Sequence, residues 1–212
     1  MNYRGWKRLR PCLESLQRLK DVSFSWEVIV VDNRSSDNQL GVFVDDFPEF
    51  YFVENVGNFG FSNGCNLGAS KATGEYLLFL NPDTLITGEA VRDLLREAEK
   101  HPEFTVLSCS QLNSNGKDTR PYGLFLTPTT LTSFLRSLYL LTHRKLKPAT
   151  LRSGALAIYP EWVSGSIMLI SRKNFDRLGG WSEDFWMYYE DADLCKRIEE
   201  SGGKVVLIKS IQ

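Results

Sequence analysis

The chain has 212 residues, enough for one large α/β domain or two small ones, and its 25 basic and 26 acidic residues leave a net charge of −1. This balance of charge gives no net electrostatic attraction to nucleic acid or anionic lipid, so nucleic acid is not an expected partner. The four cysteines stand far apart, which predicts reduced thiols in a cytoplasmic protein, and the two histidines lack neighbouring ligands, which argues against zinc. There is no apolar run of about 18 residues and no signal peptide before the fold, so we expect no transmembrane span.

Strands and helices alternate along the first half of the chain. Short apolar runs predict buried strands at 26–31, 50–53, 76–80 and 104–109. Apolar residues at helical spacing predict helices at 8–20, 40–47, 61–72 and 89–100. This alternation predicts an α/β fold with a mainly parallel, twisted sheet and helices on both faces. The turn signal at 113–116 predicts a small hairpin over 110–120.

The pattern changes after residue 120. Leucines at helical spacing over 131–141, followed by a basic run at 143–147, predict either a core-facing helix with a solvated end or a segment in peripheral contact with a membrane. The remaining elements are a predicted strand at 161–170, a helix at 173–178, a helix at 190–201 and a last strand at 204–208.

Two predicted strands have an aspartate at or just beyond their carboxyl end. Asp32 follows the first strand, and Pro82 ends the third strand so that Asp83 lies at its carboxyl edge beside Asn81. Ligands of open α/β sheets bind at that edge, so Asp83 is a candidate ligand for a hard cation or a sugar hydroxyl. The alternative is that Asp83 caps the next helix or forms a turn.

Two further segments have unusual composition. Residues 55–68 hold four glycines and four asparagines and lead into a helix, where a diphosphate could bind, although a structural loop is the alternative. Residues 181–193 hold five acids among five aromatics, with Glu190 and Asp191 in the first turn of a predicted helix. The helix dipole alone favours acids there, whereas flanking aromatics would desolvate one acid and raise its pKa toward that of a base.

Four motifs stand in order along the chain: Val-Asp-Asn-x-Ser-x-Asp, Glu-Asn-x-Gly-x-x-Gly-x-x-x-Gly-x-Asn-x-Gly, Phe-Leu-Asn-Pro-Asp-Thr and Tyr-Glu-Asp-x-Asp-Leu, at 31–37, 54–68, 79–84 and 189–194. This set resembles the inverting family 2 glycosyltransferases, which have the glycosyltransferase A-type fold, and within them the rhamnosyltransferase-like branch. The resemblance runs from Asn2 to about Ile208. It implies a single domain over 1–212, with a nucleotide-binding half at 1–110 and an acceptor-binding half at 111–212.

The resemblance also implies an activity. The chain would move a sugar from a dTDP- or UDP-activated donor to a saccharide or lipid-linked acceptor, with inversion, in cell-surface polysaccharide synthesis at the inner face of the membrane. Asp191 would be the general base, and Asp83 would hold the donor diphosphate through Mg²⁺ or Mn²⁺. The implied donor-binding residues are Asp32, Asn55, Gly60, Asn63, Asn81 and Asp83. The implied acceptor-binding residues are Trp181, Trp186 and Glu190.

The chain departs from the family pattern at both ends. The pattern implies a strand before the Asn2–Tyr3 pair, where this chain has only Met1, and a histidine and further helices beyond the last strand, where it ends at Gln212. We therefore expect two unpaired strand edges in the middle of the sheet, filled by another segment or left open. If they are left open, the alternative function is that of a truncated, non-catalytic sugar-nucleotide-binding remnant. A nucleotidyltransferase would need a Gly-rich loop bearing Arg or Lys near its start, and none is visible.

Overall fold

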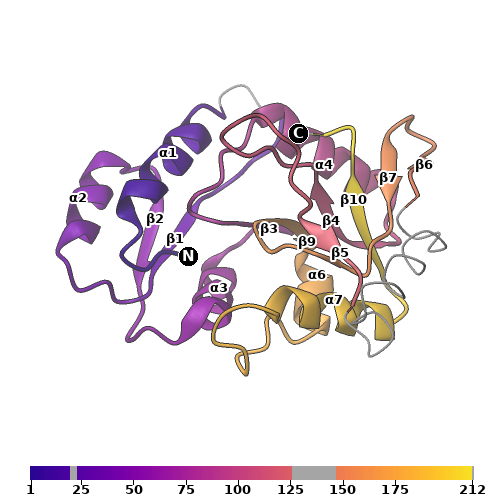
Figure 1. Ribbon diagram of the computed structural model, residues 1–212. Coiled ribbons are helices and arrows are strands. Elements are labelled where there is room, and N and C mark those ends of the chain that lie inside the picture. Colours follow the sequence, from indigo (N-terminus) through magenta and orange to yellow (C-terminus); the bar gives the residue numbers. More distant parts are fainter. Residues whose placement is uncertain (20–22, 126–146, 212) are drawn as a thin grey trace.

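The computed structural model describes residues 1–19, 23–125 and 147–211 (Figure 1). The predicted helix at 131–141 lies outside these residues, as does nearly all of the basic run that follows it. Within the described part of the chain, no helix is both long and apolar enough to cross a membrane.

A six-stranded mixed sheet forms the centre of the fold (Figure 1). Its strands, in spatial order, are β3 (Tyr76–Leu80), β9 (Ile167–Ser171), β4 (Phe104–Cys109), β10 (Lys204–Ile208), β7 (Leu156–Ile158) and β6 (Ala149–Thr150). β4 and β10 pair in parallel, whereas β9 lies antiparallel between β3 and β4. The apolar runs predicted β3, β4 and β10 with their observed bounds.

Two shorter pairs of strands complete the sheets. β1 (Ile29–Asp32) and β2 (Tyr51–Glu54) form a separate parallel pair, and β5 (Tyr122–Gly123) pairs antiparallel with β8 (Trp162–Val163). The predicted strand at 161–170 is therefore two strands, β8 and β9, which are separated by residues 164–166. The expected hairpin at 110–120 is present as a tight turn with one antiparallel bridge, between Leu112 and Asp118.

Helices cover both faces of the central sheet, as predicted. They are α1 (Trp6–Gln17), α3 (Gly60–Lys71), α4 (Gly88–Lys100), α6 (Arg172–Arg177) and α7 (Glu190–Glu200). A further helix, α2 (Gln39–Asp46), packs against β2 of the separate parallel pair. Alternate strand residues point to opposite faces, so Leu107 and Leu169 join one core with α1 and α4, while Val106 and Met168 join a second core with α3, α6 and α7. The α/β fold class is confirmed. The expectation of a mainly parallel sheet is wrong, because among the described strands only β1–β2 and β4–β10 pair in parallel and the other pairs are antiparallel.

The sheet is interrupted between β1 and β3. In the described residues, β1 pairs with β2 and meets Asn2 in a single parallel bridge to Asp32, while β3 pairs only with β9. A cavity of about 700 Å³ lies between the two strands. Among the described residues, the edge of β3 away from β9 has no strand partner and the edge of β1 away from β2 has only the bridge to Asn2, in line with the expected open edges.

Candidate active site

Asp32 closes the turn that follows β1. Its side chain is 2% exposed; Oδ1 accepts hydrogen bonds from Asn2 Nδ2 (3.1 Å) and the Ser35 hydroxyl, and Oδ2 accepts one from the Ser35 N–H (2.9 Å). These bonds fix the loop after the strand, because a buried carboxylate needs such partners. A contact between Asp32 and the donor stays a prediction.

A chain of asparagine side chains connects the ends of β1 and β2 to α3. Asn33 Nδ2 donates to the Gly60 carbonyl (2.8 Å), and Asn55 Nδ2 donates to Asn33 Oδ1 (3.1 Å) and Asn63 Oδ1 (2.7 Å). Asn63 Nδ2 in turn donates to Glu183 Oε2 (2.8 Å). The structure thus brings together Asn55, Gly60 and Asn63, three residues expected to line the donor pocket.

Glu183 joins α3 to the segment before α7. Its Oε1 accepts from Asn66 Nδ2 (2.9 Å), and the two asparagine bonds hold the pKa of Glu183 below its ordinary value. Asn66 also exchanges hydrogen bonds with the backbone of Trp181, at 2.9 and 3.0 Å. Asn66 is a fixed position of the motif at 54–68 but was given no role from the sequence, and Glu183 was not singled out.

Gly60 allows α3 to begin against the loop that precedes α7. Its φ is +90°, and a Cβ there would lie 2.4 Å from the Trp186 carbonyl oxygen. The Phe61 N–H donates to the same oxygen (3.1 Å). The observed neighbour of Gly60 is therefore protein backbone, and its contact with a donor stays a prediction.

Asp191 lies half-buried in the first turn of α7. Its Oδ2 accepts from the Gly165 N–H (3.3 Å) and its Oδ1 from the Ala192 N–H (2.8 Å). Burial raises the pKa of Asp191 in spite of these two bonds, which lower it. The neighbouring Glu190 is 8% exposed, and burial, together with the charge of Asp191, raises its pKa also. A carboxylate with a raised pKa is suited to accept a proton.

The end of β3 and the start of α7 meet at one short segment, residues 164–166. The Asn81 N–H donates to the Ser166 carbonyl (3.0 Å), and Asp191 accepts from the adjacent Gly165. Asp83 lies exposed in the turn that Asn81 begins. The turn bearing Asp83 and the carboxylate of Asp191 are thus each joined by one hydrogen bond to neighbouring residues. Ser166 also donates through its hydroxyl to Gln111 Oε1 (3.0 Å), a contact that no motif indicated.

Asp83 provides a single carboxylate for a metal ion. In the residues that the structure describes, no group of three or more His, Cys, Asp and Glu side chains could hold one. Mg²⁺ commonly binds through one or two carboxylates together with substrate phosphates, so Asp83 fits a site completed by a donor diphosphate. It does not fit a site built from protein ligands alone.

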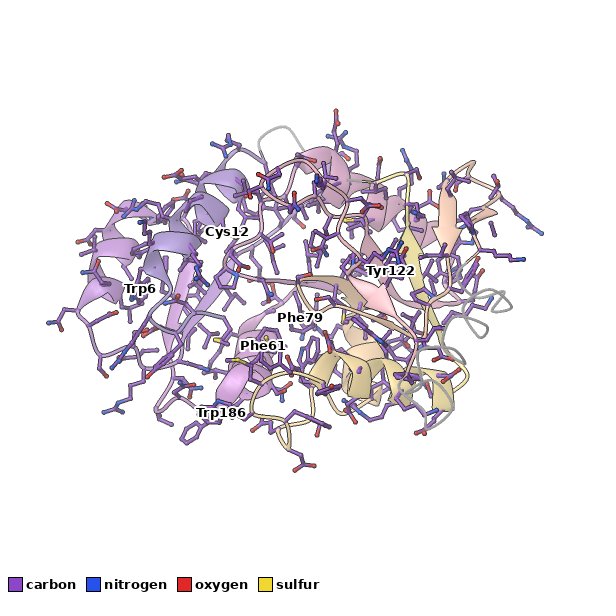
Figure 2. All side chains as sticks on the ribbon, viewed as in Figure 1. Trp6, Cys12, Phe61, Phe79, Tyr122 and Trp186 are labelled. Atoms are coloured by element: carbon purple, nitrogen blue, oxygen red, sulfur yellow. The ribbon has the colours of Figure 1, made fainter. Side chains whose placement is uncertain are left out.

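The two tryptophans expected to bind an acceptor differ in exposure. Trp181 is 1% exposed and packs edge-on against Phe61 (5.5 Å between ring centroids) and Phe79 (5.1 Å). The expectation that its face contacts a sugar is wrong for this structure, because both faces are covered by the core. Trp186 is 56% exposed, so its acceptor contact stays a prediction. Figure 2 shows Phe61 and Phe79 toward the middle of the molecule and Trp186 near its edge.

The loop after Trp186 exposes three more large side chains, Met187, Tyr188 and Tyr189. Both tyrosines adopt positive φ, 71° and 70°, a left-handed conformation that non-glycine residues rarely adopt and that clusters at functional sites. The aromatic content of this segment is visible in the sequence, whereas its exposure is not.

The sequence model of glycosyl transferase family 2 matches residues 1–175. The chain belongs to this family. A second sequence model, described as the N-terminal domain of galactosyltransferase, matches residues 143–212 of this family 2 chain.

Curated relatives include glycan-building enzymes. The chain is 30% identical over 180 residues to the low-salt glycan biosynthesis hexosyltransferase Agl10 of Haloferax volcanii, covering 81% of this chain and 52% of the relative. It is 26% identical over 194 residues to the rhamnosyltransferase WbbL of Escherichia coli, covering 88% and 71% respectively. This family 2 chain thus spans about half the length of the first relative.

Solved structures share the fold. GalNAc-T7 with UDP, GalNAc and Mn²⁺ aligns with a TM-score of 0.69 at 17% identity, covering 96% of this chain and 39% of that one. The mannosyltransferase PcManGT of Pyrobaculum calidifontis, with GDP-Man and Mn²⁺, aligns with a TM-score of 0.66 at 18% identity, covering 99% and 55%. This family 2 domain therefore has the glycosyltransferase A-type fold that the motifs implied.

Proposed function

We propose that this chain transfers a sugar from a dTDP- or UDP-activated donor to an acceptor hydroxyl, with inversion at the anomeric carbon. The observation that carries the proposal is that the end of β3 and the start of α7 both bond to residues 164–166. Asp191 accepts a hydrogen bond from Gly165, and Asn81, which leads to Asp83, donates one to Ser166. A general base and a diphosphate-binding residue held beside the same segment suit a reaction in which the acceptor oxygen displaces the diphosphate in one step.

Asp191 is the proposed general base. It takes the proton of the acceptor hydroxyl while that oxygen forms a bond to the anomeric carbon, and the bond from that carbon to the diphosphate oxygen breaks on the opposite face. One such displacement inverts the configuration. Its raised pKa supports this role, since a base is most effective when its pKa approaches the working pH.

The donor is proposed to lie along the carboxyl ends of β1 and β3. Asn55 and Asn63 line the nucleotide side, with Asp32 holding the loop beneath them, and Asp83 faces the diphosphate. A Mg²⁺ or Mn²⁺ ion held by Asp83 would neutralise charge on the leaving diphosphate. Neighbours of the same fold that were solved with nucleotides and Mn²⁺ support this arrangement.

The acceptor is proposed to be a saccharide carried on a polyprenyl diphosphate. A Mycobacterium tuberculosis relative, 23% identical over 207 residues, is named for rhamnose transfer to N-acetylglucosaminyl-diphospho-decaprenol. The exposed side chains of Trp186 and Tyr188 beside α7 suit an amphipathic ligand of this kind. Such an acceptor implies work at the inner face of the membrane.

The test compares Asp191→Asn with Asp193→Asn in the same helical turn. Nucleoside diphosphate release is measured over a panel of UDP- and dTDP-sugars, with the decaprenyl acceptor and Mn²⁺. Asp191→Asn is expected to lower kcat by about 10²–10⁴-fold. Asp193 instead pairs with Arg197 (2.7 Å), so its variant loses about 0.3–0.5 kcal/mol of stability and keeps its turnover. Equal turnover in the two variants would refute the assignment.

The open edges of β1 and β3 favour a second candidate, a domain that binds a sugar nucleotide without turning it over. Calorimetry with UDP or dTDP and Mn²⁺ distinguishes the two. Binding without any release of nucleoside diphosphate over the whole panel supports the second candidate, and turnover excludes it.

A further inference from the structure

Residues 164–166 lie at one edge of the central sheet, where β3 and β4 end and β9 begins. The three strand ends meet there because β9 is antiparallel to both of its neighbours. On the β3 side, backbone pairing holds the segment. β9 pairs with β3 over all 5 of its residues, and the Asn81 N–H continues the ladder by donating to the Ser166 carbonyl (3.0 Å).

On the β4 side, backbone pairing stops before this segment is reached. β9 shares register pairs with β4 only at Val106 and Leu107, and the last two residues of β4 pair with β10 alone. A side chain takes over from the ladder. The Ser166 hydroxyl donates to Gln111 Oε1 (3.0 Å), and Gln111 is the second residue after β4. Among the described hydrogen bonds, this one connects residues 164–166 to the end of β4.

Gln111 is held firmly at its backbone. Its carbonyl accepts from both the N–H (2.8 Å) and the hydroxyl (3.0 Å) of Thr119 across the turn. Its side chain is less well satisfied, because Nε2 is buried and has no hydrogen-bond partner among the described residues. An apolar side chain of similar length would lose the bond to Ser166 but would also remove the cost of burying this unpaired donor. Stability should therefore change little on such a replacement.

The bond between Gln111 and Ser166 lies beside two contacts of the proposed site. The Ser166 carbonyl binds the residue that begins the turn bearing Asp83, and the adjacent Gly165 N–H donates to Asp191 Oδ2 (3.3 Å). Movement of this short segment alters both contacts together. The bond from Gly165 lowers the pKa of Asp191 against the larger, raising effect of burial, so its loss raises that pKa further.

We propose that Gln111 is a positioning residue for the transfer reaction. By holding Ser166 in place, it fixes the turn that bears Asp83 relative to the carboxylate of Asp191. The inference rests on the proposed function, since it assigns a role toward the same two carboxylates. Misplacing a reacting group by about 1 Å can cost about 100-fold in rate, so such a bond can affect activity far more than stability.

The experiment compares Gln111→Met, Ser166→Ala and the double variant with the unmodified chain. Methionine is about as long as glutamine but does not replace its amide acceptor, and alanine removes the donor hydroxyl. Each single variant is expected to lower kcat by about tenfold or more while its urea midpoint stays nearly unchanged. The double variant should fall no further, because both changes break the same bond. Ser166→Thr keeps the hydroxyl and should retain most of the activity.

Thr119→Val is the matched control. It removes the hydroxyl that bonds to the Gln111 carbonyl and leaves the side-chain bond to Ser166 in place. This variant is expected to lose stability in urea and to keep its kcat. Equal losses of kcat in Thr119→Val and Gln111→Met would overturn the proposal, because the fold of the turn, rather than the side-chain bond, would then account for the effect.

The pKa of Asp191 can be measured without turnover, by titration of its carboxyl carbon in nuclear magnetic resonance. It is expected to be higher in the two single variants than in the unmodified chain, and unchanged in the control. Glu190 and Cys195, the titratable groups of α7 that interact with the charge of Asp191, are the same in all of these chains. A general loss of stability would not move this pKa in a fixed direction.

Hydrogen exchange at the amides of Asn81 and Gly165 measures the positioning itself. Exchange is expected to be about tenfold faster in both single variants and unchanged in the control. If the unmodified chain has no turnover, the proposed function fails, and the exchange rates and the pKa of Asp191 still decide this inference. Unchanged exchange or an unchanged pKa in the single variants overturns it. Where turnover is present, a kcat equal to that of the unmodified chain overturns it also.

Discussion

Replacing Trp181 by alanine is expected to destabilise the domain severely, whereas the same change at Trp186 is not. Trp181 is 1% exposed and lies edge-on to Phe61 and Phe79. Removing a fully buried tryptophan costs about 3–5 kcal/mol, of which each aromatic pair supplies about 0.5–1.5 kcal/mol. For a domain of this size the thermal midpoint should fall by about 6–20 °C.

Activity is expected to fall with the same substitution. Trp181 packs against the segment that positions Asp191, since a Cβ at Gly165 would lie 3.3 Å from Trp181 Cη2. Loss of the ring frees that segment and the hydrogen bond between Gly165 and Asp191. A Trp181→Phe variant keeps an aromatic ring and should recover roughly half of the lost stability.

The assay is urea unfolding followed by circular dichroism, with Trp186→Ala as the matched control. Trp186 is 56% exposed, so its removal should change stability by less than about 0.5 kcal/mol while raising the KM for acceptor. A cost below about 1 kcal/mol for Trp181→Ala, or equal costs for both tryptophans, would refute the reasoning.

Four further outcomes are expected. Gly60→Ala should cost about 1–3 kcal/mol in urea unfolding, because φ is +90° and the Cβ meets the Trp186 carbonyl; Gly202→Ala, at φ +75° in open space, should cost less. Glu183→Gln should destabilise the folded domain at neutral pH and progressively less as the pH falls. The pKa of Glu183 is lowered in the folded state, so the stability that its carboxylate contributes is lost as the carboxylate is protonated. Thermal melts over a range of pH check this. The kcat/KM of the unmodified chain should fall as pH drops through a value above the ordinary aspartate range, since burial raises the pKa of Asp191, and a fall only at ordinary aspartate pH would contradict that role. Asp83→Asn should abolish the Mn²⁺-dependent part of the thermal shift produced by UDP, and an unchanged shift would remove Asp83 from the metal site.

The sequence predicted the central strands well because their signals are local. β3 is an unbroken apolar run, and β4 and β10 are mostly apolar runs. Such runs, bounded by proline, glycine or polar residues, indicate where a buried strand starts and stops. Their direction is not local information. The apolar pattern of β9 is the same whether the strand runs parallel or antiparallel to its neighbours. Its place between β3 and β4 could therefore not be predicted from its own residues.

In the candidate site, too, the features with local sequence signals were predicted and the long-range contacts were not. Asp83 and Asp191 follow from strand-end and helix-start patterns. The structure joins Asp191 and Asn81, the residue that begins the turn bearing Asp83, to residues 164–166. The bond between Asn66 and Glu183 spans 117 residues, and no local pattern carries such a pairing. The tryptophan assignment failed because aromatic content does not reveal which ring points inward. Gly179 and Gly180, both at positive φ, turn the chain so that Trp181 enters the core.

The most direct test of the central claim is paramagnetic relaxation of backbone amides by Mn²⁺ in the presence of UDP or dTDP. If Asp83 and Asp191 flank one donor site, the amides of Thr84, Gly165 and Ala192 broaden together, and Asp83→Asn removes the broadening of all three. The amide of Gly203, beyond the far end of α7, serves as the internal control and stays sharp. Broadening at Thr84 without Gly165 and Ala192 would contradict the account, since it would place the metal away from the proposed base.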